Sequence, residues 1–327
     1  LTVEGNFTAD GGTIKLDGNY PVGTGNVALG DTALDSGSLS GSSNTALGSG
    51  ALTANTTGSN TAVGRNALFN NTTGSTNTGI GQQALTTNTT GSSNTALGRD
   101  SLLSNTTASE NVAVGYQAGY STTTGGANTS VGVKALYLNT TAVANTALGW
   151  NAAYSNTTGA SNVAIGYQSL ASNTTASNNV AVGYQAGYSF TTGGYSTVMG
   201  YQAAQNATAG GTVAIGHSSA KNNTGAGITA VGSNALVTNT SGTSSTGIGT
   251  NALNDNTTGG YNVALGRNAL YSNTTANNNT AVGYAALNLN TTGTQNVALG
   301  QSAASSTTTG GQNTAVGTNA LNSNTTA

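Results

Sequence analysis

The chain has 327 residues, of which 6 are basic and 8 acidic, and it carries a single proline and no cysteine. Charged residues make up 4% of the sequence, against roughly 25% in an average soluble protein. Six basic residues cannot neutralise a phosphate backbone, so nucleic acid is not an expected partner. Disulfides and thiolate metal sites are excluded without cysteine, and no apolar run is long enough to predict membrane insertion.

The first 25 residues differ from the rest of the chain. Short alternating segments at residues 1–4 and 13–17 predict a β-rich N-terminal lead-in over residues 1–25. The sequence starts at Leu1, not Met, and shows no signal-peptide pattern there. We therefore expect a processed or partial product.

Residues 26–327 repeat a 17-residue unit about eighteen times. Each unit contains an anchor glycine, here position 0, directly after a large aliphatic residue. The consensus reads N-[TV]-A-[VLI]-G-x-x-A-[LA]-x-x-N-T-T-G-x-x. Asn, Thr, Ser and Gly are poor helix formers, and 17 residues cannot hold a helix, a strand and two turns. The pattern predicts an all-β fold: a parallel β-solenoid, or β-roll, with one coil per repeat, forming a shaft over 26–327.

The columns of the repeat predict which side chains are buried. Position −1 is always large and apolar and position −3 is Thr or Val, so the two share one strand face and are expected to form the core. Position −2 is small in every copy except Val198 and is expected to face outward. A second strand-like segment is predicted around positions +3 and +4. Three chains meeting on the outward small column would bury it, which predicts a homotrimer.

The motif Asn-Thr-Ala-Val-Gly-Tyr resembles sequences in two groups of fibrous proteins. One is the head repeat of trimeric autotransporter adhesins, a left-handed parallel β-roll whose period is shorter. The other, more similar group is the marine phage tail-fibre repeat proteins, which share Asn-Thr-Thr-Gly and the lead-in Leu-Thr-Val-Glu-Gly. The resemblance covers residues 26–327 and implies a trimeric shaft in a virion tail fibre or at an extracellular surface. Such fibres often carry a C-terminal folding chaperone that is cut off, and no such domain is seen here.

No catalytic constellation appears, so an enzyme, a cofactor and a metal are not expected. His217 is the only histidine, and its position directly after an anchor glycine favours a surface ladder residue. The acidic residues do not recur at the repeat period, which argues against calcium-binding turns.

The Asn-Thr-Thr column has two interpretations. Each member is a formal N-glycosylation acceptor, but asparagines stacked in consecutive coils also form amide ladders, which is the favoured explanation. The residues are Asn55, Asn71, Asn88, Asn105, Asn139, Asn156, Asn173, Asn256, Asn273, Asn290 and Asn324.

Aromatic residues recur at positions +1 and +5. They could contact glycans, although stacking between coils or subunit contact is the favoured explanation. The position +1 members are Tyr116, Trp150, Tyr167, Tyr184, Tyr201 and Tyr284.

The predicted function is a structural fibre shaft that spaces or presents a receptor-binding tip. The alternatives are a bacterial surface adhesin whose shaft binds host glycans or a receptor, and, more remotely, an ice-binding solenoid. Ice binding is disfavoured because the threonine at position −3 is expected to point inward. We also expect irregular structure over residues 190–232, where two units have 16 residues. Because the repeat stops within a unit, we expect either a C-terminal piece beyond residue 327 or end-to-end filament assembly.

Overall fold

The structure is a computed structural model that describes residues 25–38 and 40–326. These residues form eighteen three-residue β-strands and no helix, which confirms the predicted all-β parallel solenoid. Apart from its last residue, the predicted lead-in lies outside the described residues. The strands are β1 (Val27–Leu29), β2 (Thr45–Leu47), β3 (Thr61–Val63), β4 (Thr78–Ile80), β5 (Thr95–Leu97), β6 (Val112–Val114), β7 (Thr129–Val131), β8 (Thr146–Leu148), β9 (Val163–Ile165), β10 (Val180–Val182), β11 (Thr197–Met199), β12 (Val213–Ile215), β13 (Thr229–Val231), β14 (Thr246–Ile248), β15 (Val263–Leu265), β16 (Thr280–Val282), β17 (Val297–Leu299) and β18 (Thr314–Val316).

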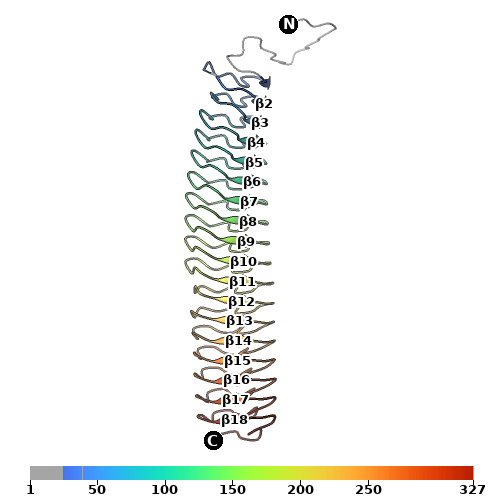
Figure 1. The fold of residues 1–327 in the computed structure, drawn as a ribbon, viewed down its shortest axis with the longest axis vertical. Coiled ribbons are helices and arrows are strands. Elements are labelled where there is room, and N and C mark those ends of the chain that lie inside the picture. Colours follow the sequence, from blue (N-terminus) through green and yellow to red (C-terminus); the bar gives the residue numbers. More distant parts are fainter. Residues whose placement is uncertain (1–24, 39, 327) are drawn as a thin grey trace, which may run out of the picture. The chain divides into compact units, whose positions relative to one another are not determined.

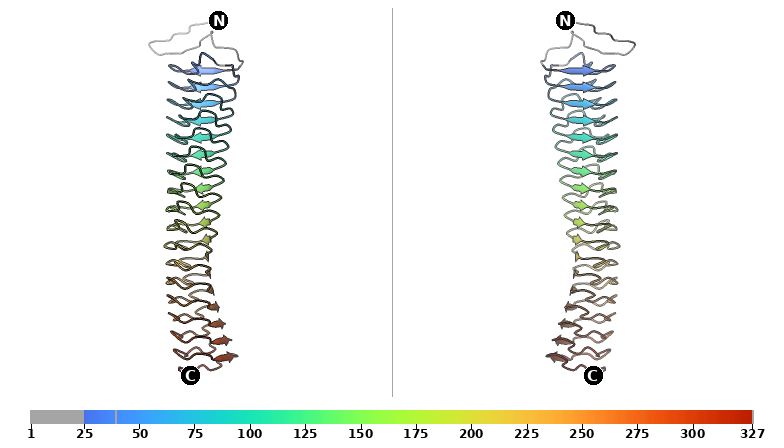
Figure 2. Two further views of the ribbon diagram at one scale, coloured as in Figure 1. Left: turned by 90° about the vertical axis from the view of Figure 1, so that its left-hand side faces the viewer. Right: turned by 90° about the vertical axis from the view of Figure 1, so that its right-hand side faces the viewer.

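The chain divides into two compact units, residues 1–160 and 161–327. The first contains β1–β8 and the second β9–β18. Within each unit every strand pairs in parallel with the next strand in sequence, so equal repeat positions lie side by side. In the first unit Ala96 of β5 lies opposite Ala113 of β6, and the strands stack like rungs in both side views (Figures 1 and 2).

The core of each coil is the reverse of the one expected from the sequence. The small column at position −2 points inward, and Ala96 and Ala113 are fully buried. The aliphatic column at position −1 points outward, and Leu148 keeps 46% of its surface exposed. The prediction of a buried aliphatic stack is therefore wrong, as is the inference that the small column forms a subunit interface.

The width of the coil explains this reversal. The buried Ala at position −2 faces a segment that already contributes Ala at position +3 and Leu at position +4 to the interior, such as Ala84 and Leu85. A Cβ added to Gly79, itself at position −2, would lie 3.3 Å from Leu68 Cγ. The interior therefore has room for one large side chain per coil, and Leu at +4 takes it.

The second predicted strand is a turn segment in the structure. Positions +2 and +4 have positive φ, 57° at Asn66 and 51° at Leu68, which a β-strand excludes. The segment still bonds to both neighbouring coils, since Asn66 N–H donates to the Ser49 carbonyl and Leu68 N–H to the Ala84 carbonyl, each at 2.9 Å. β-Branched residues are absent from position +4, as expected where φ is positive.

The anchor glycine is fixed by contact between coils. Gly115 has φ of +134°, and a Cβ there would lie 2.6 Å from the carbonyl oxygen of Gly132 in the next coil. No side chain fits such a gap. This close approach accounts for the invariance of glycine at position 0.

The two 16-residue units between Gly200 and Gly232 keep their strands in register. Thr197 pairs with Val213, and Val213 pairs with Thr229, as in the other coils. The missing residue of each unit is therefore taken from the loop that precedes the next strand. Phe190, fully buried, also replaces the usual asparagine in this region.

Candidate functional site

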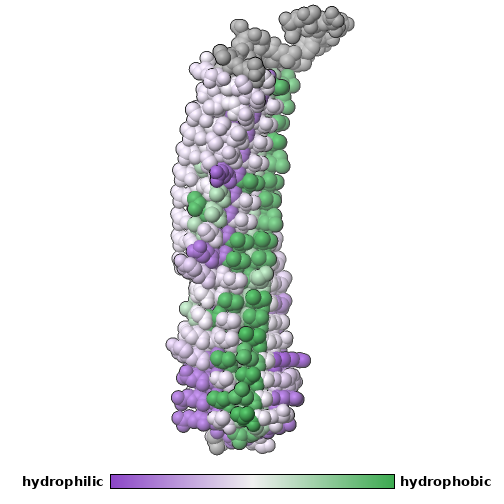
Figure 3. Space-filling model, viewed as in Figure 1, coloured by the Kyte–Doolittle hydropathy of each residue, from purple (hydrophilic) through white to green (hydrophobic). Residues whose placement is uncertain are grey.

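The outward face of the strands is a surface feature that recurs in every coil. Positions −3 and −1 hold only Thr, Val, Leu, Ile and Met in both units. Leu97 and Ile248 are 45% and 41% exposed. Figure 3 shows hydrophobic side chains gathered over the strands of each unit. No charged residue interrupts these two columns and position −1 is apolar in every coil, so the face is uncharged and largely apolar along the stack of each unit.

The asparagines at position +7 form buried amide ladders. Asn88 Nδ2 donates to Asn71 Oδ1 at 2.7 Å and to the Gly91 carbonyl at 2.9 Å, and Asn105 Nδ2 in turn donates to Asn88 Oδ1 at 2.6 Å. The second unit repeats this geometry, with Asn256 donating to Asn239 at 2.6 Å. A buried amide nitrogen that makes two hydrogen bonds has no room for a glycan in this fold.

All but one of the predicted ladder residues are fully buried. Asn324 in the last coil is only half-buried. The fully buried members are Asn55, Asn71, Asn88, Asn105, Asn139, Asn156, Asn173, Asn256, Asn273 and Asn290.

A second asparagine ladder occupies position −4, immediately before β1–β10 and β15–β18, while Ser, Thr or Ile takes this position before β11–β14. The backbone N–H of Asn94 donates to Asn77 Oδ1 at 2.9 Å, and Asn94 Nδ2 donates to the Ala108 carbonyl of the next coil at 2.8 Å. Sequence reasoning missed this ladder as a structural element. The asparagine that begins the repeat consensus is the sequence feature that could have predicted this ladder.

The position +7 ladder stops where another residue replaces asparagine. Asn105 Oδ1 is buried without a hydrogen-bond partner because the next coil has Thr122. Asn290 Oδ1 is also buried without a hydrogen-bond partner, because the next coil has Thr307. These interruptions are polar defects of the core, which cost stability rather than create a ligand site.

The aromatic residues at position +1 stack along the coils. In the second unit Tyr167, Tyr184, Tyr201 and His217 form a continuous pile with ring centroids 5.0–5.4 Å apart. Each ring inside the pile is covered on both faces by its neighbours, so it offers only its edge to a ligand. In the first unit the Arg99 guanidinium lies 5.9 Å from the ring centroid of Tyr116.

The remaining position +1 aromatics are partly exposed. Trp150 is 43% exposed in the first unit, and Tyr284 is 50% exposed in the second.

Position +5 carries a second pile in the first unit. The rings of Tyr120, Tyr137 and Tyr154 stack with centroids 5.1 Å apart, and Lys134 Nζ lies 5.3 Å from the Tyr137 centroid. Burial raises the pKa of Tyr137 above its usual value, and the neighbouring tyrosines raise it further. The pile behaves as a packing element.

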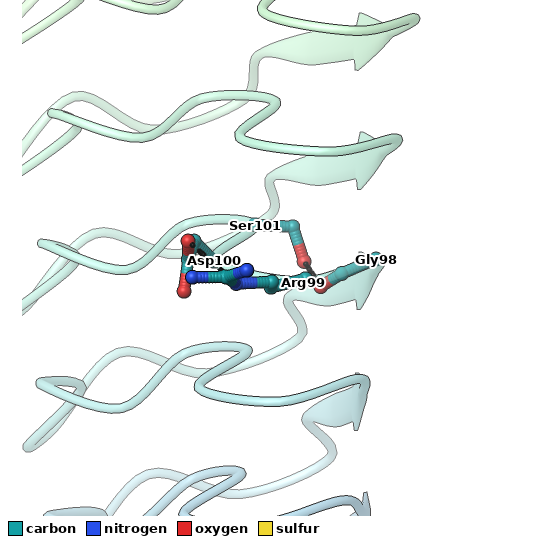
Figure 4. Close-up of polar contacts among 4 residues, drawn as sticks. All are labelled: Gly98, Arg99, Asp100 and Ser101. Atoms are coloured by element: carbon teal, nitrogen blue, oxygen red, sulfur yellow. Dashed lines mark hydrogen bonds and ion pairs between the residues drawn. The ribbon is translucent and has the colours of Figure 1, made fainter.

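One carboxylate of the first unit is buried. Asp100 Oδ2 lies 3.3 Å from Arg99 Nε, while Asp100 Oδ1 has no hydrogen-bond partner (Figure 4). Ser101 Oγ donates to the Gly98 carbonyl at 2.9 Å in the same turn. Among the described residues no group of three or more His, Cys, Asp or Glu side chains could hold a metal ion.

Within residues 25–38 and 40–326, no helix is long and apolar enough to cross a membrane. No protein-family model matches the sequence, and neither a curated protein nor a solved structure matches it. The function is therefore inferred from the fold and its surfaces.

Proposed function

We propose that the chain is the structural shaft of a fibre, such as a phage tail fibre or an extracellular filament that presents a receptor-binding tip. The observation that supports this most directly is the apolar outward face of the strands, repeated in every coil. A long solvent-exposed apolar face marks an interaction surface. Here it would bind further copies of the same chain along its length.

The size of this face fits a stable assembly. At about 4.8 Å per coil and about 3.4 Å per residue, the ten three-residue strands of the second unit present a face roughly 48 Å long and about 10 Å wide, or roughly 500 Å². A standard stable interface buries about 800 Å² on each partner. One unit therefore supplies more than half of the area that a lasting contact requires.

The proposed assembly remains a homotrimer, but on a different surface from the one that the sequence suggested. The contact is assigned to positions −3 and −1, because the alanines at position −2 are buried inside each coil. A closed ring of three chains buries the apolar face of each without leaving an open edge.

The test is the mass of the assembly in solution. We expect sedimentation analysis of the unmodified chain to give a trimer, and Leu148→Asp combined with Ile248→Asp to give monomers that retain the β-sheet circular dichroism spectrum. Ser241→Asp, at an exposed loop position, is the matched control and should stay trimeric. A stable monomer of the unmodified chain would contradict the proposal.

Ice binding is a second candidate, because the threonines at position −3 point outward. The expectation that they point inward is wrong: Thr95 is exposed, and Thr78 and Thr129 are half-buried on the outward face. The adjoining position −1 varies among Leu, Val, Ile and Met, so the face is less regular than an ice-ordering array would need. Thermal hysteresis measured on the unmodified chain and on Thr95→Lys decides this alternative.

A further inference from the structure

Two tyrosines of the second unit stand apart from every aromatic pile. Tyr195 is 79% exposed and Tyr261 is 63% exposed, more than any other tyrosine among the described residues. Both occupy position −5, at the turn that leads into a strand, with φ of 60° and 56°. Neither ring stacks on another aromatic ring within the part of the chain that the structure describes, so no aromatic neighbour covers either ring.

The column between these tyrosines is nearly empty of side chains. From Tyr195, position −5 continues through Gly211, Gly227 and Ser244 to Tyr261. The two rings are thus four coils apart, about 19 Å at the usual strand spacing. The two glycines belong to the 16-residue units, whose loops before the strand are shortened by one residue.

The backbone does not require glycine at either position. A Cβ on Gly211 would have its nearest neighbour 3.9 Å away, and one on Gly227 would lie 3.6 Å from Ser244 Oγ, which are ordinary contacts. Their φ values of 68° and 71° are close to those that Tyr195, Ala127 and other residues adopt at position −5. Packing therefore leaves room for side chains between the tyrosines, and the left-handed φ of the two glycines favours glycine without requiring it.

The surroundings are neutral and polar. Position −5 has no charged residue in the second unit, and the exposed amides of Asn178 and Asn278 lie one coil beyond the two tyrosines. Thr208 and Ser241 are exposed in the shortened and adjoining loops. Hydroxyl and amide groups beside exposed aromatic rings suit a neutral polyhydroxylated ligand.

We infer that this strip binds a linear neutral oligosaccharide that lies along the coil stack with its ends on Tyr195 and Tyr261. The pyranose C–H faces pack on the two rings, as apolar surfaces do on exposed aromatics. The glycines at positions 211 and 227 let the middle of the sugar chain approach the backbone. The site lies on the turns before the strands and not at positions −3 and −1, so its occupancy can be measured separately from the assembly of the shaft.

The two-ring geometry predicts a length dependence. A disaccharide reaches only one tyrosine, whereas a hexasaccharide reaches both, and linking two contacts in one ligand increases affinity strongly. We expect calorimetric titration with the β-1,4-linked series cellobiose to cellohexaose, and with chitohexaose and mannohexaose, to show at least one hexasaccharide that binds at least about tenfold tighter than its disaccharide.

Alanine variants of the two tyrosines test whether their rings contact the sugar. Tyr195→Ala and Tyr261→Ala should each raise the hexasaccharide Kd about 5- to 10-fold and abolish the length dependence. The double variant should multiply the two effects, because the sites are too far apart to couple directly. Alanine already occupies position −5 at Ala127 and Ala144, so the fold tolerates both changes.

Tyr284→Ala is the matched control, since Tyr284 is half exposed but lies at position +1. It should leave the hexasaccharide Kd unchanged. The inference is overturned if none of the three hexasaccharides binds the unmodified chain at millimolar concentration. It is equally overturned if both tyrosine variants bind like the unmodified chain, or if Tyr284→Ala weakens binding as much as they do.

Discussion

Asn88 and Asn71 lie one coil apart, and their side-chain amides are joined by a 2.7 Å hydrogen bond inside the core. The same Asn88 nitrogen bonds the Gly91 carbonyl, so one side chain ties its own turn to the neighbouring coil. This double role makes the asparagine a structural residue that cannot be exchanged for an apolar one without loss.

Replacing Asn88 by alanine removes these hydrogen bonds and leaves their buried polar partners unsatisfied. We expect Asn88→Ala to lower the free energy of unfolding by about 2–4 kcal/mol, measured by urea denaturation. Asn278→Ala is the control, because Asn278 is exposed and its position accepts alanine elsewhere; it should change stability by less than about 0.5 kcal/mol. Equal losses in both variants would contradict the ladder as a source of stability.

Two glycines at different positions of the repeat should respond differently to alanine. Gly115→Ala, at position 0, places a Cβ 2.6 Å from a backbone oxygen that cannot move aside, and should cost about 3–5 kcal/mol. Gly211→Ala, at position −5, meets no atom closer than 3.9 Å but keeps a left-handed φ of 68°, and should cost only about 1 kcal/mol. Thermal melting of the two variants tests this, and a tolerated Gly115→Ala would show that the coils are not so closely spaced.

The reversed core predicts opposite behaviour for a leucine at position +4, Leu136, and one at position −1, Leu148. Leu136 is 1% exposed and Leu148 is 46% exposed. Leu136→Ala should cost about 2–5 kcal/mol in unfolding free energy, whereas Leu148→Ala should cost less than about 1 kcal/mol in the dissociated chain. The measurement is made at a dilution where assembly is absent. A larger loss for Leu148 would restore the core that the sequence pattern suggested.

Gly187 and Phe190 exchange roles with the usual leucine and asparagine. A Cβ on Gly187 would lie 2.9 Å from Phe190 Cδ2, so the ring occupies space that leucine fills in other coils. Phe190→Asn should cost about 3–5 kcal/mol by leaving a cavity. Adding Gly187→Leu restores the common pattern and should recover most of that loss.

The control for this pair is Gly187→Leu alone, which should destabilise by overpacking. A double-mutant cycle followed by thermal melting gives the coupling between the two positions. Additive effects of the two substitutions would mean that they do not share one space in the core.

The sequence alone determined the repeat, the parallel solenoid and the special role of position 0. Those features follow from local rules: Gly115 and its equivalents recur at one spacing, and the residues between them favour turns and short strands. Stacked asparagines at one position, such as Asn71 and Asn88, likewise predicted an amide ladder.

Only the tertiary structure decided which side of each strand is buried. Alternation places Ala96 on one face and Thr95 and Leu97 on the other, but it is symmetric between inside and outside. Hydrophobicity favoured burying Leu97, but in the structure Ala96 is buried and Leu97 is exposed. The left-handed turn at position +4 already directs Leu102 into a coil with room for one large side chain. Space inside the coil, which no single column of the sequence reveals, therefore assigns alanine to the core and leaves the aliphatic column on the surface.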